Sequence, residues 1–106
     1  EATLLTLSHD SITAITTLTW SEPNAPGGLS TSLRYDVIRS SSAADFDSAA
    51  VCLATQRVTP VAQDGSTPAP NAVLFYLARA TNACPSGTGT LGFRSSGSER
   101  IGRLCP

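Results

Sequence analysis

The chain has no lysine and no methionine among its 106 residues, and it has only one histidine and one tryptophan. All seven basic residues are arginines, and together with eight acidic residues they give a formal net charge of −1. A protein that binds the phosphate backbone of nucleic acid presents a concentrated basic surface. The sequence has no cluster of basic residues, so we expect no nucleic-acid partner.

Long hydrophobic runs are also absent. The longest apolar run covers residues 72–78, whereas a membrane-spanning helix needs about 20 apolar residues. We therefore expect no membrane insertion. A chain of this length forms one domain, which we place at residues 1–106.

The first residue is Glu1, and no methionine occurs anywhere. These two features indicate a processed or excised piece of a longer precursor, from which a signal peptide has been removed. We therefore expect a secreted, extracellular protein.

Helical periodicity is missing from every part of the chain, whereas short runs of β-branched and aromatic residues recur between turn-forming residues. Serine and threonine, 14 and 13 in number, supply most of the polar side chains. This pattern predicts an all-β fold, a seven-stranded antiparallel Greek-key sandwich. The expected strands cover residues 3–7, 13–20, 34–39, 51–55, 58–61, 73–81 and 91–96.

Three segments resemble strands B, C and F of fibronectin type III domains: residues 18–23 (LTWSEP), 35–39 (YDVIR) and 76–82 (YLARATN). The segment that follows, with its Cys84-Pro85 and its terminal Cys105-Pro106, is similar to a variant found at the C-terminal ends of secreted bacterial proteins. The resemblance covers nearly the whole chain. It implies an immunoglobulin-like sandwich with these residues facing inward: Trp20, Tyr35, Val37, Tyr76, Ala78 and Ala80.

Three cysteines leave at least one thiol unpaired within a monomer. In a secreted protein a disulfide is favoured, and we expect it between Cys84 and Cys105, where it would fix the C-terminal tail. Cys52 has apolar neighbours and is expected to be a small buried hydrophobic residue. Because connectivity does not follow from sequence, the pairings that involve Cys52 stay open.

Candidate chemical groups are few. His9 lies beside Asp10 in an expected turn, and no pocket is indicated around it, so we expect an exposed turn residue and no catalysis. Asp45, Asp47 and Asp64 could offer oxygen ligands to calcium, but they lack the spacing of a calcium loop and are expected to be solvated. We therefore expect no cofactor and no metal. The chain has no Asn-x-Ser/Thr sequon, so any glycan would be O-linked.

Two classes of function remain. The first is a structural module of an extracellular bacterial protein, either a spacer, a terminal module or the subunit of a surface filament. The second is a carbohydrate-binding or spacer domain attached to a secreted hydrolase. Sugar binding needs exposed aromatic rings, for which the candidates are Phe46, Phe75 and Phe93.

The first strand carries the assembly hypothesis. It contains Leu4, Leu5 and Leu7, and the chain has no lysine to protect a sheet edge. This strand could pair within its own domain or with the edge of a neighbour. In the second case a head-to-tail filament would form, and the partners would be copies of the chain or neighbouring modules.

Overall fold

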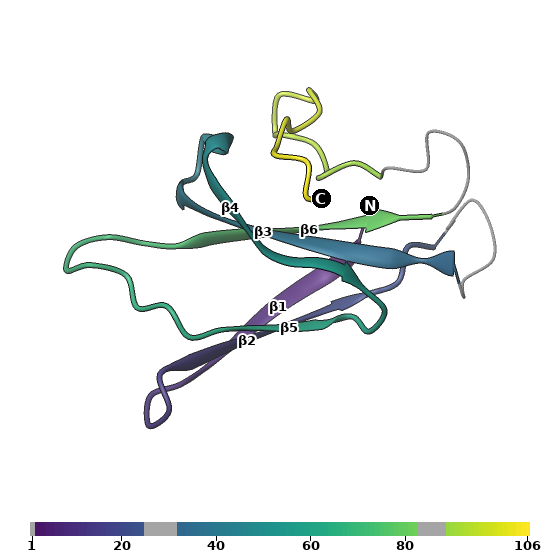
Figure 1. Ribbon diagram of the computed structural model, residues 1–106. Helices are drawn as coiled ribbons and strands as arrows, with labels where there is room; N and C mark the ends of the chain where they lie inside the picture. Colours follow the sequence, from purple (N-terminus) through teal and green to yellow (C-terminus); the bar gives the residue numbers. More distant parts are fainter. Residues whose placement is uncertain (1, 25–31, 83–88) are drawn as a thin grey trace.

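Two antiparallel sheets of three strands each pack face to face in the computed structural model, which describes residues 2–24, 32–82 and 89–106 (Figure 1). The first sheet has the order β1-β2-β5 and the second the order β4-β3-β6. The strands are β1 (Thr3–Asp10), β2 (Ile15–Ser21), β3 (Arg34–Ser42), β4 (Asp45–Arg57), β5 (Val61–Asp64) and β6 (Phe75–Thr81). The predicted all-β sandwich is confirmed, with six strands in place of seven. No helix in the described ranges is long and apolar enough to cross a membrane.

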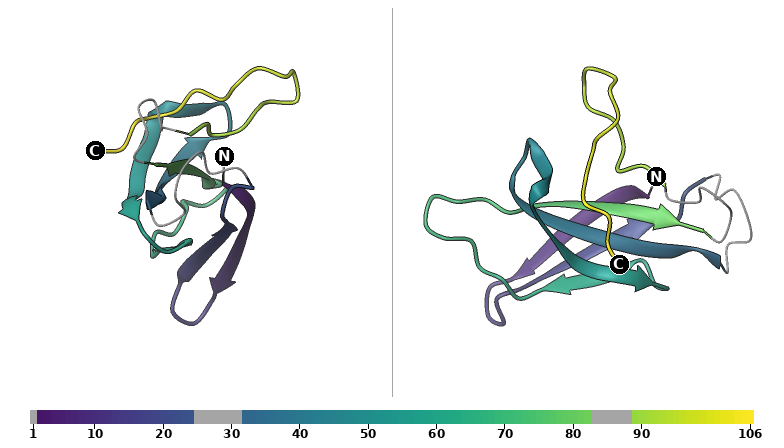
Figure 2. Two further views of the ribbon diagram at one scale, coloured as in Figure 1. Left: turned by 90° about the vertical axis from the view of Figure 1, so that its right-hand side faces the viewer. Right: turned by 45° about the horizontal axis from the view of Figure 1, so that its top comes forward.

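The seventh strand, expected over residues 91–96, is not formed. Gly92 has a φ of 86°, a conformation that an extended strand does not contain, so the chain turns away directly after Leu91. Phe93 and Glu99 form only an isolated bridge. The remaining residues pass over the second sheet on the side that faces away from β1 and β2 (Figure 2).

Two other boundaries differ from the sequence-based expectation. β4 has 13 residues and includes the short strand predicted at 51–55, because β3 and β4 form one long hairpin around Ala43 and Ala44. The strand predicted at 58–61 begins only at Val61. Proline lacks the N–H that a strand needs, and the carbonyl of Pro60 instead accepts a hydrogen bond from the backbone N–H of Trp20 (3.2 Å).

The core between the two sheets contains five of the six side chains that were predicted to face inward. Its buried side chains are Leu18, Trp20, Leu33, Tyr35, Val37, Ala62, Ala78 and Ala80. The rings of Trp20 and Tyr35 meet edge to face with centroids 5.4 Å apart, a favourable aromatic geometry. Among the six predicted core positions only Tyr76 is partly exposed, because it lies at the end of this core.

A second core lies on the outer face of the second sheet, beneath the C-terminal segment. Ile38, Phe46, Ala50 and Leu91 are buried there. Successive side chains of a strand point to opposite faces, so Val37 enters the first core and Ile38 the second, and both are fully buried. The molecule therefore has three layers, two sheets and a cover made by residues 89–106.

Hydrogen bonds hold this cover in place. The guanidinium of Arg79 donates to the carbonyls of Arg103 (3.2 Å) and Gly102 (3.4 Å), and the N–H of Arg103 donates to the carbonyl of Phe46 (2.7 Å). Gly102 is required by close approach, because a Cβ there would overlap the Leu91 side chain and lie 3.2 Å from the Phe46 oxygen. The cover thus fits the sheet closely at the point where it crosses β4.

We expect Ile38→Ala to lower the free energy of unfolding by about 2 to 5 kcal/mol, because it opens a cavity in the second core. Ile12→Ala is the matched control. Ile12 is 93% exposed, so its substitution should change the stability by less than about 0.5 kcal/mol. Urea unfolding of both variants measures the difference, and equal midpoints would contradict a packed second core.

Candidate functional site

One lateral side of the sandwich is open. β1 is the edge strand of the first sheet and β6 the edge strand of the second. A cleft of about 330 Å³ lies between them, and we call it the lateral cleft. Its lining consists of residues 2–5, Leu77 and Ala78 of β6, residues 91–93 and Arg100.

The predicted assembly leucines lie in β1, which pairs with β2 of its own sheet. Leu5 packs against the first core, whereas Leu4 is 78% and Leu7 51% exposed. The register between β1 and β2 shifts between Thr3 and Thr6. Leu4 lies in this irregular stretch with a φ of 53°, which is uncommon for a non-glycine residue and costs about 1 to 3 kcal/mol. The structure therefore exposes an apolar side chain on a strained edge.

The β6 edge is largely unpaired as well. Within the described residues, the backbone hydrogen bond on this edge runs from the N–H of Gly89 to the carbonyl of Ala80 (2.8 Å). The C=O and N–H of one residue point to the same side of an antiparallel strand, and this side alternates along the strand. The backbone groups of Ala78 and Tyr76 therefore point outward too. A seventh strand would have covered them.

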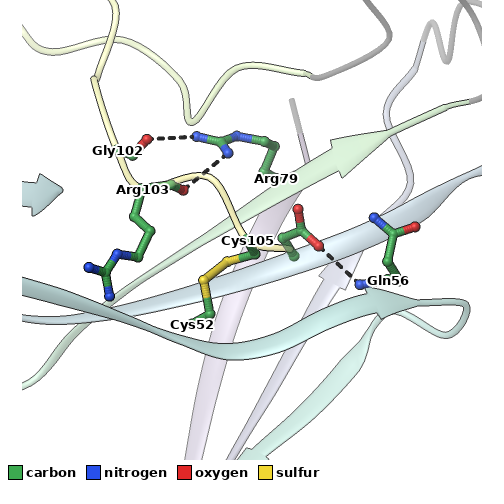
Figure 3. The surroundings of a disulfide bond; sticks show 7 residues. Cys52, Gln56, Arg79, Gly102, Arg103 and Cys105 are labelled. Atoms are coloured by element: carbon green, nitrogen blue, oxygen red, sulfur yellow. Dashed lines mark hydrogen bonds between the residues drawn. A yellow bond between two sulfur atoms is a disulfide. The ribbon is translucent and has the colours of Figure 1, made fainter.

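The disulfide joins Cys52 of β4 to Cys105 near the C-terminus, with Cα atoms 5.8 Å apart (Figure 3). The predicted pairing of Cys84 with Cys105 is therefore wrong, and so is the expectation that Cys52 is a free buried thiol. The reason is the path of the tail, which crosses the second sheet and reaches β4. Cys84 itself lies outside the described residues.

We expect Cys105→Ser to release the cover. The disulfide closes a segment of 53 residues, for which the chain-entropy relation gives about 4 kcal/mol of stabilisation. Amide hydrogen exchange over residues 89–106 should accelerate more than exchange in β2. Peptide mapping without reductant should recover Cys52 and Cys105 in one linked fragment, and a linked fragment that contains Cys84 would contradict this pairing.

A polar cluster at one end of the first core connects the two sheets. Arg39 of β3 forms an ion pair with Asp64 of β5 (2.9 Å), and the Tyr76 hydroxyl donates to the same carboxylate (2.9 Å). The backbone N–H of Ser66 is a third donor (2.9 Å). Asp64 is only 3% exposed, so its prediction as a solvated carboxylate is wrong. No local sequence pattern indicates this cluster, since Arg39, Asp64 and Tyr76 come from three separate strands or their ends.

The other two candidate calcium ligands serve a turn or face solvent. Asp45 accepts hydrogen bonds from the N–H groups of Asp47 (2.8 Å) and Ser48 (2.9 Å), and Asp47 is exposed. The described residues contain no group of three or more His, Cys, Asp or Glu side chains that could hold a metal ion.

The cluster shifts two pKa values. Burial alone raises the pKa of Asp64, but hydrogen bonds from Ser66, Arg39 and Tyr76 outweigh it and hold this pKa below its ordinary value. Burial, together with the hydrogen bond to Asp64, raises the pKa of Tyr76 to about 12. Both shifts favour a carboxylate that faces a neutral phenol.

We expect stability to fall at both extremes of pH. The lowered pKa of Asp64 stabilises the fold above its unfolded pKa of about 4, and this contribution is lost as pH falls through the folded pKa. The raised pKa of Tyr76 stabilises the fold below about pH 10, and this contribution is lost as pH rises toward 12. Urea midpoints measured against pH should therefore show a smaller alkaline decrease in Tyr76→Phe. An unchanged alkaline limb would contradict the hydrogen bond to Asp64.

A wider apolar cleft of about 530 Å³ lies at the same end, between the β1–β2 hairpin and residues 66–74. His9 belongs to β1 and not to a turn, and its Nδ1 lies 2.9 Å from the Thr16 hydroxyl. A hydroxyl beside an imidazole is one part of a nucleophilic site. The same site needs a group that orients the imidazole and donors for an oxyanion, and the described residues place none there. The nearby hydroxyls of Tyr76 and Ser66 are already bonded to Asp64 and Arg39.

The three phenylalanines differ in exposure. Phe46 is 7% exposed and lies in the second core, so it is wrongly predicted as a sugar-binding surface. Phe75 is partly buried against the same core. Phe93 is 56% exposed and lies beside the lateral cleft. Only one of the three candidates therefore offers an open ring.

Comparison with known proteins identifies the fold. A solved structure of an Fn3-like protein from Clostridium thermocellum superposes on this chain with a TM-score of 0.58. The match covers 77% of this chain and 75% of that one, at 20% sequence identity. No protein-family model and no curated protein matches the sequence. The fibronectin type III-like fold expected from the sequence is thus confirmed at the level of structure.

Proposed function

We propose that this domain is a non-catalytic structural module of a secreted bacterial protein, and that it associates with copies of itself through its open lateral side. The observation that carries this proposal is the coincidence of two largely open strand edges with a cleft between them. Exposed edges without protection favour pairing with another chain.

The usual protections are weak here. Charged side chains, above all lysine, normally interrupt an edge strand. The chain has no lysine, and the exposed charge nearest the middle of β1 is Asp10 at its far end. The irregular stretch at Leu4 twists only the beginning of the strand. Association at this edge would remove the exposed Leu4 side chain from water.

An extracellular location is supported by the disulfide. Disulfides form and persist in oxidising compartments and are rare in the cytosol. The disulfide between Cys52 and Cys105 holds the cover that buries the second core. A fold that depends on such a bond fits secretion. The alternative, a carbohydrate-binding or spacer domain of a hydrolase, has only Phe93 as an exposed aromatic candidate.

The test is a pair of matched substitutions. Leu4→Lys introduces a charge at the open edge and should weaken self-association by about tenfold or more. Ile12→Lys introduces the same charge at a still more exposed residue in the β1–β2 turn and should leave association unchanged. Sedimentation velocity over a range of concentrations measures both. A wild-type chain that stays monomeric throughout would overturn the proposal.

A further inference from the structure

Both open edges lie on the same side of the sandwich. β1 contributes Thr3, Leu4 and Leu5 to the lateral cleft, and β6 contributes Leu77 and Ala78. The opposite side is formed by β4 and β5, which contact each other. A partner that approaches the lateral cleft therefore meets one edge of each sheet at once.

The two edge strands run in opposite directions. β1 starts near the N-terminus and leads away from it, whereas the arrow of β6 points back toward the N-terminus (Figure 1). A rotation of 180° about an axis parallel to the strands keeps these directions and exchanges the two sheets. It therefore brings β1 of one copy beside β6 of the other in antiparallel orientation, which is the pairing used throughout this fold.

From this geometry we infer that the partner is a second copy of this chain, bound in a closed two-fold dimer in which β1 of each copy pairs with β6 of the other. The inference rests on the proposed function, because it specifies the partner for the same surface. The contact is isologous, since each copy offers the same two edges and receives the same two edges.

Hydrogen bonding favours this partner. The outward backbone groups of Tyr76 and Ala78 need an extended strand with a free edge beside them. The chain's own tail does not supply one, because Cys105 is bound to β4 on the far side of the sheet. β1 supplies a strand of eight residues whose outer edge is open. A second copy can therefore provide it with no unfolding of the β1–β2 pair.

The exposed apolar side chains beside the lateral cleft are consistent with the contact between β1 and β6 of two copies. Leu4 and Phe93 are the strongly exposed apolar residues that line it, at 78% and 56% exposure. The rotation places β1 of one copy beside β6 of the other. Leu4 of the first copy therefore approaches Phe93 of the second. Both side chains would then leave water together.

The same-side arrangement also decides between a filament and a closed pair. A head-to-tail filament needs its donor and acceptor surfaces on different sides of the subunit. Here the two-fold pair uses both edges at once and leaves neither for a third copy. A head-to-tail filament, as expected from a donated first strand, would need another contact.

A charge-exchange experiment on the full, disulfide-bonded chain tests this pairing. Leu4→Lys and Phe93→Glu each place a charge in one half of the contact, and each variant alone should dimerise about tenfold more weakly than the wild type. In an equimolar mixture, one junction joins the new Lys to the new Glu and the other junction is wild type. The mixture should therefore dimerise with near wild-type affinity. Ile12→Lys and Val58→Glu, exposed residues away from the cleft, form the matched control pair and should have no effect singly or mixed.

Sedimentation equilibrium separates the outcomes. A monomer–dimer equilibrium that saturates at the dimer, with rescue in the mixture, supports the inference. Growth beyond the dimer overturns the inference and leaves the proposed function standing. A dimer without rescue in the mixture assigns the contact to other surfaces and also overturns it. A chain that remains monomeric overturns both.

Discussion

The covalent link between Cys52 and Cys105 is the constraint on which the other features of this domain depend. It joins the end of the chain to the edge strand β4, so the segment after β6 has to cross the whole second sheet. Residues 91–106 lie across this sheet and, from Gly92 on, do not extend along β6 as a seventh strand. The disulfide, the second core and the open β6 edge are thus three consequences of one path of the chain.

This path explains the burial of the second sheet. In an ordinary two-layer sandwich the outer face of each sheet is in contact with water and carries polar side chains. Here Ile38, Phe46 and Ala50 occupy the outer face and are covered by Leu91. The buried Arg79 is compatible with this apolar layer because carbonyl groups of the cover accept its hydrogen bonds. The cover is therefore a structural layer that completes the domain.

The sequence predicted the parts of the fold that depend on local pattern. The alternation around Trp20 and the succession of Tyr35 and Val37 identified the first core, because residues two apart share a face of a strand. Ile38 was as strong a signal for a second buried face, yet the pattern of one strand does not reveal what covers it. The disulfide was mispredicted for the same reason, since Cys84 is nearer to Cys105 in sequence, whereas the path of the tail brings Cys105 to Cys52. Contacts such as Arg39 with Asp64 join strands of different sheets, and no local pattern specifies them.

In the candidate site, too, only the features that depend on local sequence could be predicted. The leucines of the first strand were recognisable from the sequence as an unprotected edge, and Leu4 is indeed exposed. The acceptor edge was not recognisable, because β6 becomes an edge only when the tail leaves it at Gly92. A single open edge would not specify the partner strand that pairs with it. Two edges on one side, antiparallel to each other and separated by a cleft, favour a partner that offers two strands in the same arrangement, and β1 and β6 of a second copy meet this requirement.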